Sequence, residues 1–106
     1  MSVAASLDRE LPVKPSRLSK PWPPAIVGQT VRDMETLKIV LGGLKLGLEH
    51  VICARVYITD FEANYPRMNA VYASYFPADR RPARTCIGVT GLARGAMVEI
   101  DLLAKR

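Results

Sequence analysis

Apolar residues recur at intervals of three and four along residues 30–44, which is the spacing of one face of an α-helix. The stripe consists of Val31, Met34, Leu37, Leu41 and Leu44. Thr30 stands at its start, where a hydroxyl group can cap the first turn. The glycine pair at residues 42–43 weakens the last turn. The pattern therefore predicts a helix that begins at Thr30.

A second helical stripe follows between residues 64 and 76. Its inward positions are Met68, Val71, Tyr72 and Tyr75. Asn64 is suited to cap this helix, Pro66 stands near its first position, and Pro77 follows its end. Methionine and aromatic residues at this spacing indicate core packing, so we assign them no chemistry.

Alternation of apolar and polar residues with a period of two predicts strands at residues 51–59, 85–89 and 97–104. In the first strand, one face carries Ile52, Ala54, Val56 and Ile58. The other face carries Cys53, Arg55, Tyr57 and Thr59. Such a mixed face is typical of a sheet that meets a partner subunit or a cavity.

The two later strands are predicted to pair with each other across a loop that contains Gly91 and Gly95. The expected helix-facing set is Ile87, Val89, Val98, Ile100, Leu102 and Ala104. In the register that we assume, Cys86 lies opposite Glu99, and Arg84 lies opposite Asp101. These four side chains would then share the face away from the helices, whereas a slip by one residue would bury Glu99 among aliphatic residues.

The order helix–strand–helix–strand–strand predicts an α+β protein with two helices on one face of a mixed sheet. A chain of 106 residues has room for one domain. Five of the eight prolines lie within residues 1–24, and proline disrupts both helices and inner strands. We therefore expect residues 1–27 to form an irregular arm and residues 28–106 to form the folded domain.

Charge and composition narrow the function classes. The net charge of +5 is moderate, and no RNA-recognition or helix-turn-helix signature is visible. We interpret Arg80, Arg81 and Arg84 as a local anion-attracting feature rather than a nucleic-acid surface. Cys53 and Cys86 are the two cysteines, and the single histidine has no partner nearby, so no metal site is expected.

Two free thiols fit a reducing compartment. The N-terminus has no apolar stretch of the kind found in signal peptides, and no run of 18 apolar residues exists. We therefore expect a cytoplasmic protein that does not act at a membrane.

Arg84 and Glu99 are the first candidates for chemistry. Arg84 offers a rigid fork of donors that suits a carboxylate, although a surface arginine paired with Asp101 or Glu99 would look the same. Glu99 lies in an apolar strand, where an unpaired charge is costly. It either pairs with Arg84 or lines a wet cleft, where it could serve as an acid or base.

Cys86 and Asn69 are weaker candidates. Cys86 could be a nucleophile, but a cysteine in a strand is usually a small buried apolar residue, and His50 is the only histidine that could activate it. Asn69 could form a hydrogen bond across a subunit contact or simply face solvent.

Several motifs occur together in the order and spacing of a known family. They are VYITD at 56–60, MNAVY at 68–72, YF at 75–76, PARTC at 82–86 and MVEID at 97–101. With them, residues 29–104 resemble the RidA/YjgF family of reactive-intermediate deaminases. The resemblance implies a chorismate-mutase-like α+β protomer and a homotrimer with three clefts between subunits.

Members of that family hydrolyse enamine and imine products of pyridoxal-phosphate-dependent dehydratases, of the 2-iminobutanoate and 2-iminopropanoate type, to 2-oxo acids and ammonia. They use no cofactor of their own, and their ligands are small imino and 2-oxo acids. By resemblance, Arg84 would bind the substrate carboxylate, Glu99 would position or activate water, and main-chain groups around Cys86 would contact the substrate.

The first 27 residues depart from the family pattern. They lack its Pro-Tyr-Ser and Ser-Gly-Gln motifs, which supply strands, a tyrosine and a serine to the cleft. The N-terminal strands are therefore expected to be missing or replaced. A second interpretation follows, in which the chain is a non-catalytic anion-binding or assembly module. RNA binding or cleavage is a third, and its local support is the arginine trio.

Overall fold

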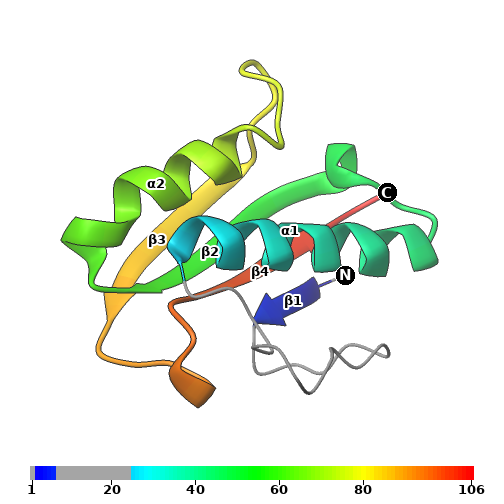
Figure 1. Ribbon diagram of the computed structural model, residues 1–106. Coiled ribbons are helices and arrows are strands. Elements are labelled where there is room, and N and C mark those ends of the chain that lie inside the picture. Colours follow the sequence, from blue (N-terminus) through cyan, green and yellow to red (C-terminus); the bar gives the residue numbers. More distant parts are fainter. Residues whose placement is uncertain (1, 7–24) are drawn as a thin grey trace.

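Two helices lie side by side on one face of a four-stranded sheet in the computed structural model (Figure 1). The structure describes residues 2–6 and 25–106, so most of the expected N-terminal arm lies outside the described residues. The helices are α1 (Ile26–Gly43) and α2 (Phe61–Ala73). The strands are β1 (Ser2–Ser6), β2 (Val51–Thr59), β3 (Ala83–Val89) and β4 (Val98–Ala104). The α+β class is as predicted.

The strands lie in the order β1-β4-β2-β3, with β2 and β3 parallel and the other pairs antiparallel. Parallel pairing follows from the unit β2-α2-β3, because a helical crossover returns the chain to the same end of the sheet. The chain then passes the end of β2, through a short 3-10 turn at Ala93–Gly95, and adds β4 on the other side. The predicted pairing of the last two strands with each other is therefore wrong.

The observed register also changes which side chains share a face. Arg84 pairs with Ala54 and therefore lies on the same side of the sheet as that buried residue, facing the helices. Cys86 lies on that side too, opposite Val56. Glu99 and Asp101 lie on the face without helices, which we call the open face. The prediction that all four side chains share one face is wrong, because β3 and β4 each pair with β2 in registers that put two of these side chains on each side of the sheet.

The same register moves part of the expected core out of it. Ile87 is 45% exposed and lies opposite Tyr57 on the open face, and Val89 lies there as well, opposite Thr59. In β4, by contrast, the residues predicted to face the helices are all buried. These are Val98, Ile100, Leu102 and Ala104.

The bounds of β2 are as predicted, but one side chain in it departs from the simple alternation. The pairing with β4 shifts between Val51 and Cys53, which marks a β-bulge. As a result Val51 is buried, whereas Ile52 is 48% exposed. The expected row of apolar residues holds from Ala54 onward.

Both helices begin earlier than predicted. Thr30 is buried in the second turn of α1, where its hydroxyl donates to the carbonyl of Ile26 at 2.7 Å, so it does not cap the helix. Val31 lies outside the buried stripe and is 38% exposed. Asn64 lies within α2, and its amide donates to the carbonyl of Thr59 at 2.8 Å, so it fastens the end of β2 to the helix.

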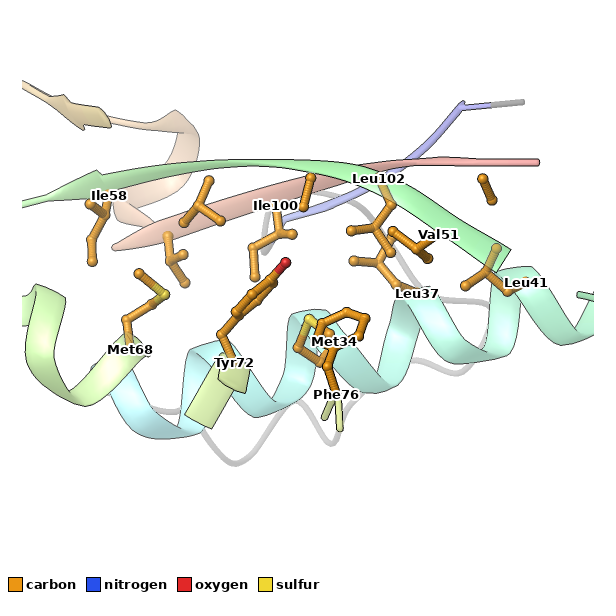
Figure 2. Close-up of a cluster of buried hydrophobic side chains, with 14 of the residues drawn as sticks. Met34, Leu37, Leu41, Val51, Ile58, Met68, Tyr72, Phe76, Ile100 and Leu102 are labelled. Carbon is orange, nitrogen blue, oxygen red and sulfur yellow. The ribbon is translucent and has the colours of Figure 1, made fainter. Parts of the chain in front are cut away.

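The core fills the space between the helices and the sheet, as Figure 2 shows. Met34, Leu37 and Leu41 of α1 have no exposed surface, as their spacing predicts. Burying each such side chain contributes about 1.5–3 kcal/mol to folding. The core therefore fixes the helices against the strands, and this contact positions the side chains between α2 and β3.

Strand β1 covers the edge of β4 that the missing family motifs would otherwise leave open. It runs antiparallel, with Ser2 opposite Leu103 and Ser6 opposite Glu99. Part of the range expected to be irregular is thus a strand. The division into an arm and a domain at residue 28 stays a prediction.

Candidate functional site

Arg84 is held in place by residues of α2. Its Nη1 donates to Oδ1 of Asn69 at 2.7 Å, and its Nη2 donates to the hydroxyl of Tyr65 at 2.8 Å. The guanidinium carbon lies 4.9 Å from the centre of the Tyr72 ring and 5.7 Å from that of Tyr65. Hydrogen bonds and cation–π contacts together therefore orient this cation without neutralising it.

The alternative of a surface arginine paired with an acid does not apply. Asp101 pairs instead with Arg55, with 2.9 Å between Nε and Oδ1. No carboxylate of residues 25–106 forms a salt bridge with Arg84. A guanidinium carries five N–H donors, and Asn69 and Tyr65 engage two of them. The remaining donors can bind an anion.

A hollow of about 300 Å³ lies next to this arginine. It is lined by Asn69, Tyr72, Ala73, Arg81, Pro82 and Arg84. Its walls come from the second half of α2 and from the start of β3 with the loop before it, which is the yellow loop at the top of Figure 1. The volume is at the lower end of the range for small-molecule pockets, so it suits a ligand of a few carbon atoms.

Tyr72 forms one wall of the hollow and also belongs to the core. Its side chain is 3% exposed, and its hydroxyl has no hydrogen-bond partner among the described residues. Burial raises the pKa of this phenol above its ordinary value of 10.0, while the Arg84 cation acts in the opposite direction. Tyr72 is therefore neutral at physiological pH and offers its ring face to the guanidinium.

Cys86 lies on the helix side of β3 and packs against the core. Burial raises the pKa of the Cys86 thiol above its ordinary value of 9.0, although Arg84 lowers it in part. The thiol is therefore protonated at neutral pH, which makes it a poor nucleophile. His50 offers no general base to it, because its Nδ1 accepts the N–H of Gly47 at 3.0 Å.

Glu99 lies on the open face of β4, opposite Tyr57 of β2, and is partly exposed. A single chain thus does not bring Glu99 and Arg84 together, since one points away from the helices and the other toward them. Sequence reasoning identified both residues but placed them on one face. Arg84 and Glu99 of one protomer therefore do not form a shared site.

No helix or strand of the described residues packs on the open face. It combines the Arg55–Asp101 ion pair with apolar side chains. The exposed ones are Ile87 at 45% and Leu103 at 37%. Exposed apolar side chains on a sheet face are one feature of surfaces that contact another protein chain.

The sequence patterns did not predict which residues hold Arg84 in place. From the sequence, Asn69 is expected at a subunit contact or in solvent, and Tyr72 is expected in the core alone. Residues 65, 69 and 72 follow one another at intervals of four and three, so they share a helix face. That spacing was the available signal, but it does not say which strand residue the face will meet.

Two further findings concern the described part of the chain. It contains no group of three His, Cys, Asp or Glu side chains arranged to hold a metal ion. Neither of its helices combines the length and the apolar character that crossing a membrane requires.

The structure thus shows an α+β protomer in which an arginine, oriented by neutral side chains and paired with no carboxylate of residues 25–106, lies beside a small hollow. The family model described as Endoribonuclease L-PSP matches residues 10–106. The chain belongs to this family, which is the RidA/YjgF family. The resemblance seen in the sequence motifs is thereby confirmed.

Two curated relatives illustrate the similarity. Protein DfrA of Myxococcus xanthus is 40% identical over 79 residues, which cover 74% of this chain and 59% of that protein. The 3-aminoacrylate deaminase RutC of Acinetobacter baylyi is 38% identical over 76 residues, which cover 72% of this chain and 59% of that protein. The chain spans about three fifths of the length of the curated relatives it matches.

Solved structures share the fold. A putative endoribonuclease from Thermotoga maritima matches with a TM-score of 0.75 and 31% identity, over 85% of this chain and 69% of that one. TdcF of E. coli, solved with bound serine, matches with a TM-score of 0.73 and 26% identity, over 79% of this chain and 67% of that one. These matches agree with two helices on one face of a mixed sheet.

Proposed function

We propose that this protein hydrolyses reactive enamines and imines of the 2-iminobutanoate and 2-iminopropanoate type to 2-oxo acids and ammonia. The observation that carries the proposal is Arg84, held by Asn69 and Tyr65 beside a hollow and without a carboxylate partner in residues 25–106. Membership of the family and the 38% identity to a protein named 3-aminoacrylate deaminase support a deaminase.

A complete site requires two copies of the chain in this proposal. Arg84 and Glu99 lie on opposite faces of the sheet, so both can reach one substrate only if the hollow of one protomer meets the open face of another. The exposed apolar residues of the open face support such a contact. A homotrimer would form three equivalent clefts, each from two neighbouring protomers.

Arg84 would bind the substrate carboxylate through the donors that its neighbours leave available, and this contact would place the imine carbon. Glu99 of the next protomer would accept a proton from water as the water oxygen forms a bond to that carbon. The electrons of the C=N double bond move to nitrogen, which takes up this proton. A second proton then passes from the new hydroxyl group to nitrogen, and the carbon–nitrogen bond breaks. Ammonia leaves, and the carbon keeps the oxygen as a 2-oxo group.

The reaction balances with water alone, because neither oxidation nor reduction occurs. An enamine enters the same route after a proton has been added to its terminal carbon. We assign no covalent step to Cys86, since its thiol stays protonated at neutral pH. The main chain around Cys86 would contact the substrate instead.

The test is turnover of an imino acid generated in the assay by an amino-acid dehydratase. The parent protein should release ammonia faster than the spontaneous hydrolysis, and Glu99→Gln should abolish this increase while retaining the affinity for a 2-oxo acid. The matched control is Cys86→Ser, which should keep most of the turnover. Turnover by Glu99→Gln at the parent rate would contradict the role of Glu99.

A non-catalytic anion-binding module is the second candidate, and a specific observation favours it. Residues 1–27 lack the family motifs that supply a tyrosine and a serine to the cleft. On this alternative the parent protein binds 2-oxo acids through Arg84 but adds nothing to the spontaneous rate of hydrolysis. Binding without turnover would therefore decide in favour of the module.

A further inference from the structure

The hollow beside Arg84 contains a second arginine that the proposed reaction does not use. Arg81 and Arg84 both line it, together with two residues that can donate hydrogen bonds and two that are apolar. Among the residues that the structure describes, no acidic one lines it. Two arginines therefore border a small space, and no described carboxylate borders it with them.

The backbone between the two arginines is restricted. Pro82 locks its own φ angle, and a residue that precedes proline is confined to extended conformations. From residue 83 the chain continues as strand β3. Three residues of chain span at most about 10–11 Å, so the Cα atoms of Arg81 and Arg84 lie within reach of one small ligand.

The charge of Arg81 is also uncompensated. No carboxylate of residues 25–106 forms a salt bridge with it. Its neighbour Arg80 has a different setting, because it lines a separate hollow that also contains Glu49 and Tyr75. Adjacent arginines with the same charge thus stand at two different sites, and only Arg81 shares the site of Arg84.

We infer that this site takes imino and 2-oxo acids that carry a second carboxylate. This inference rests on the proposed function, because it assigns Arg84 to the carboxylate next to the reacting carbon. Arg81 binds the distal carboxylate at the other side of the hollow. Both carboxylates of such a ligand are ionised at neutral pH, so each can form a charge-assisted hydrogen bond with a guanidinium.

Two ligands of equal chain length test the inference. 2-Oxoglutarate has a carboxylate at its far end, whereas 2-oxopentanoate has a methyl group there. Calorimetry on the full chain should give 2-oxoglutarate an affinity about tenfold higher. Arg81→Ala should remove this preference, because it should weaken the binding of 2-oxoglutarate about tenfold more than that of 2-oxopentanoate. Arg80→Ala removes the same charge one residue away and should retain the preference.

The outcomes separate this inference from the proposed function. Equal affinity of the parent protein for both ligands, absence of binding by either, or a preference that survives in Arg81→Ala would overturn the inference. A preference lost equally in Arg80→Ala would also overturn it, because the general positive field would then be the cause. If 2-oxoglutarate binds preferentially and no imine is turned over, the inference stands and the proposed function falls.

Discussion

Arg84 takes its orientation from neutral groups on α2 and not from another charge. Asn69 and Tyr65 accept hydrogen bonds from it, and the ring of Tyr72 faces it. A carboxylate in their place would have satisfied the arginine and closed the site to anions. Neutral acceptors fix the geometry but leave the charge available to a ligand.

The first prediction at this scale concerns Arg84→Ala. Small 2-oxo acids such as pyruvate or 2-oxobutanoate should bind more than tenfold more weakly to this variant, since a charge-assisted hydrogen bond contributes about 1.5–3 kcal/mol. Isothermal calorimetry measures the change. Arg84→Lys should restore only part of the affinity because an ammonium group lacks the planar fork. An unchanged affinity in Arg84→Ala would rule out the anion-binding role.

The candidate site could be predicted only in part. The spacing of motifs led to Arg84, Glu99 and Cys86, which are strand residues. The residues that support Arg84 lie on a helix, and their contact with it depends on how α2 packs against β3. This packing is decided by core residues distant in the chain, such as Met34 and Ile100, and no local pattern encodes it.

At the scale of elements, the alternation of apolar and polar residues predicted the bounds of β2 correctly. The capping residues, by contrast, predicted helix starts that are too late in the chain. Strand β2 is half buried, so its pattern of apolar and polar residues is visible. The sequence at the start of α1 carries no capping signal, because Ala25 at its N-cap makes no side-chain hydrogen bond. Pro66 lies inside α2, where its missing N–H is tolerated since both Pro66 and Glu62 are exposed and water can bind the free carbonyl.

Sheet topology could not be read from neighbours in the sequence. Strands β3 and β4 follow each other in the chain, yet β2 lies between them. The strand–helix–strand unit places β3 beside β2 and leaves the other edge of β2 free for β4. Which edge of β2 pairs with β4 depends on the crossover through α2. The faces on which Arg84 and Glu99 lie could therefore not be assigned from alternation alone.

A prediction for α1 follows from its buried face. Leu37→Ala should lower the free energy of unfolding by about 2–5 kcal/mol, because Leu37 has no exposed surface and its loss leaves a cavity. Ile39→Ala is the matched control, since Ile39 lies on the same helix at 70% exposure and should change the value by less than about 0.5 kcal/mol. Urea denaturation measures both. Equal effects would show that α1 does not pack as described.

The turn that follows α2 is linked to α1 by a hydrogen bond that responds to pH. The Tyr75 hydroxyl donates to Oε2 of Glu35 at 2.7 Å, and burial together with this acid raises the pKa of Tyr75 to about 12 from 10.0. The folded pKa exceeds the unfolded one, so the contribution to stability is present below pH 10 and is lost as the pH rises toward 12.

Tyr75→Phe tests this link. The variant should be less stable than the parent by about 1 kcal/mol at neutral pH, which is the usual contribution of one hydrogen bond. The difference in melting temperature should stay constant up to pH 10 and shrink between pH 10 and 12, as the phenol of the parent ionises. A difference that does not change with pH would assign the effect to packing alone.

At the scale of the whole molecule, the proposed cleft places a second protomer against the open face. We expect the protein to sediment as a trimer, and Ile87→Glu on the open face should shift it to smaller species by placing a charge in the contact. Ile39→Glu on the outer side of α1 is the control and should leave the assembly intact. A well-folded parent monomer at micromolar concentration would contradict the proposed cleft.

The opposite orientation of Arg84 and Glu99 has a consequence for mixtures of chains. In the proposed trimer each cleft borrows one group from each of two neighbours, so a chain defective in Arg84 and a chain defective in Glu99 are both inactive alone. Combined in equal amounts, they would rebuild intact clefts in about one quarter of the positions by random assortment. Activity would then be a shared property of the population, and it would fade on dilution as neighbours separate.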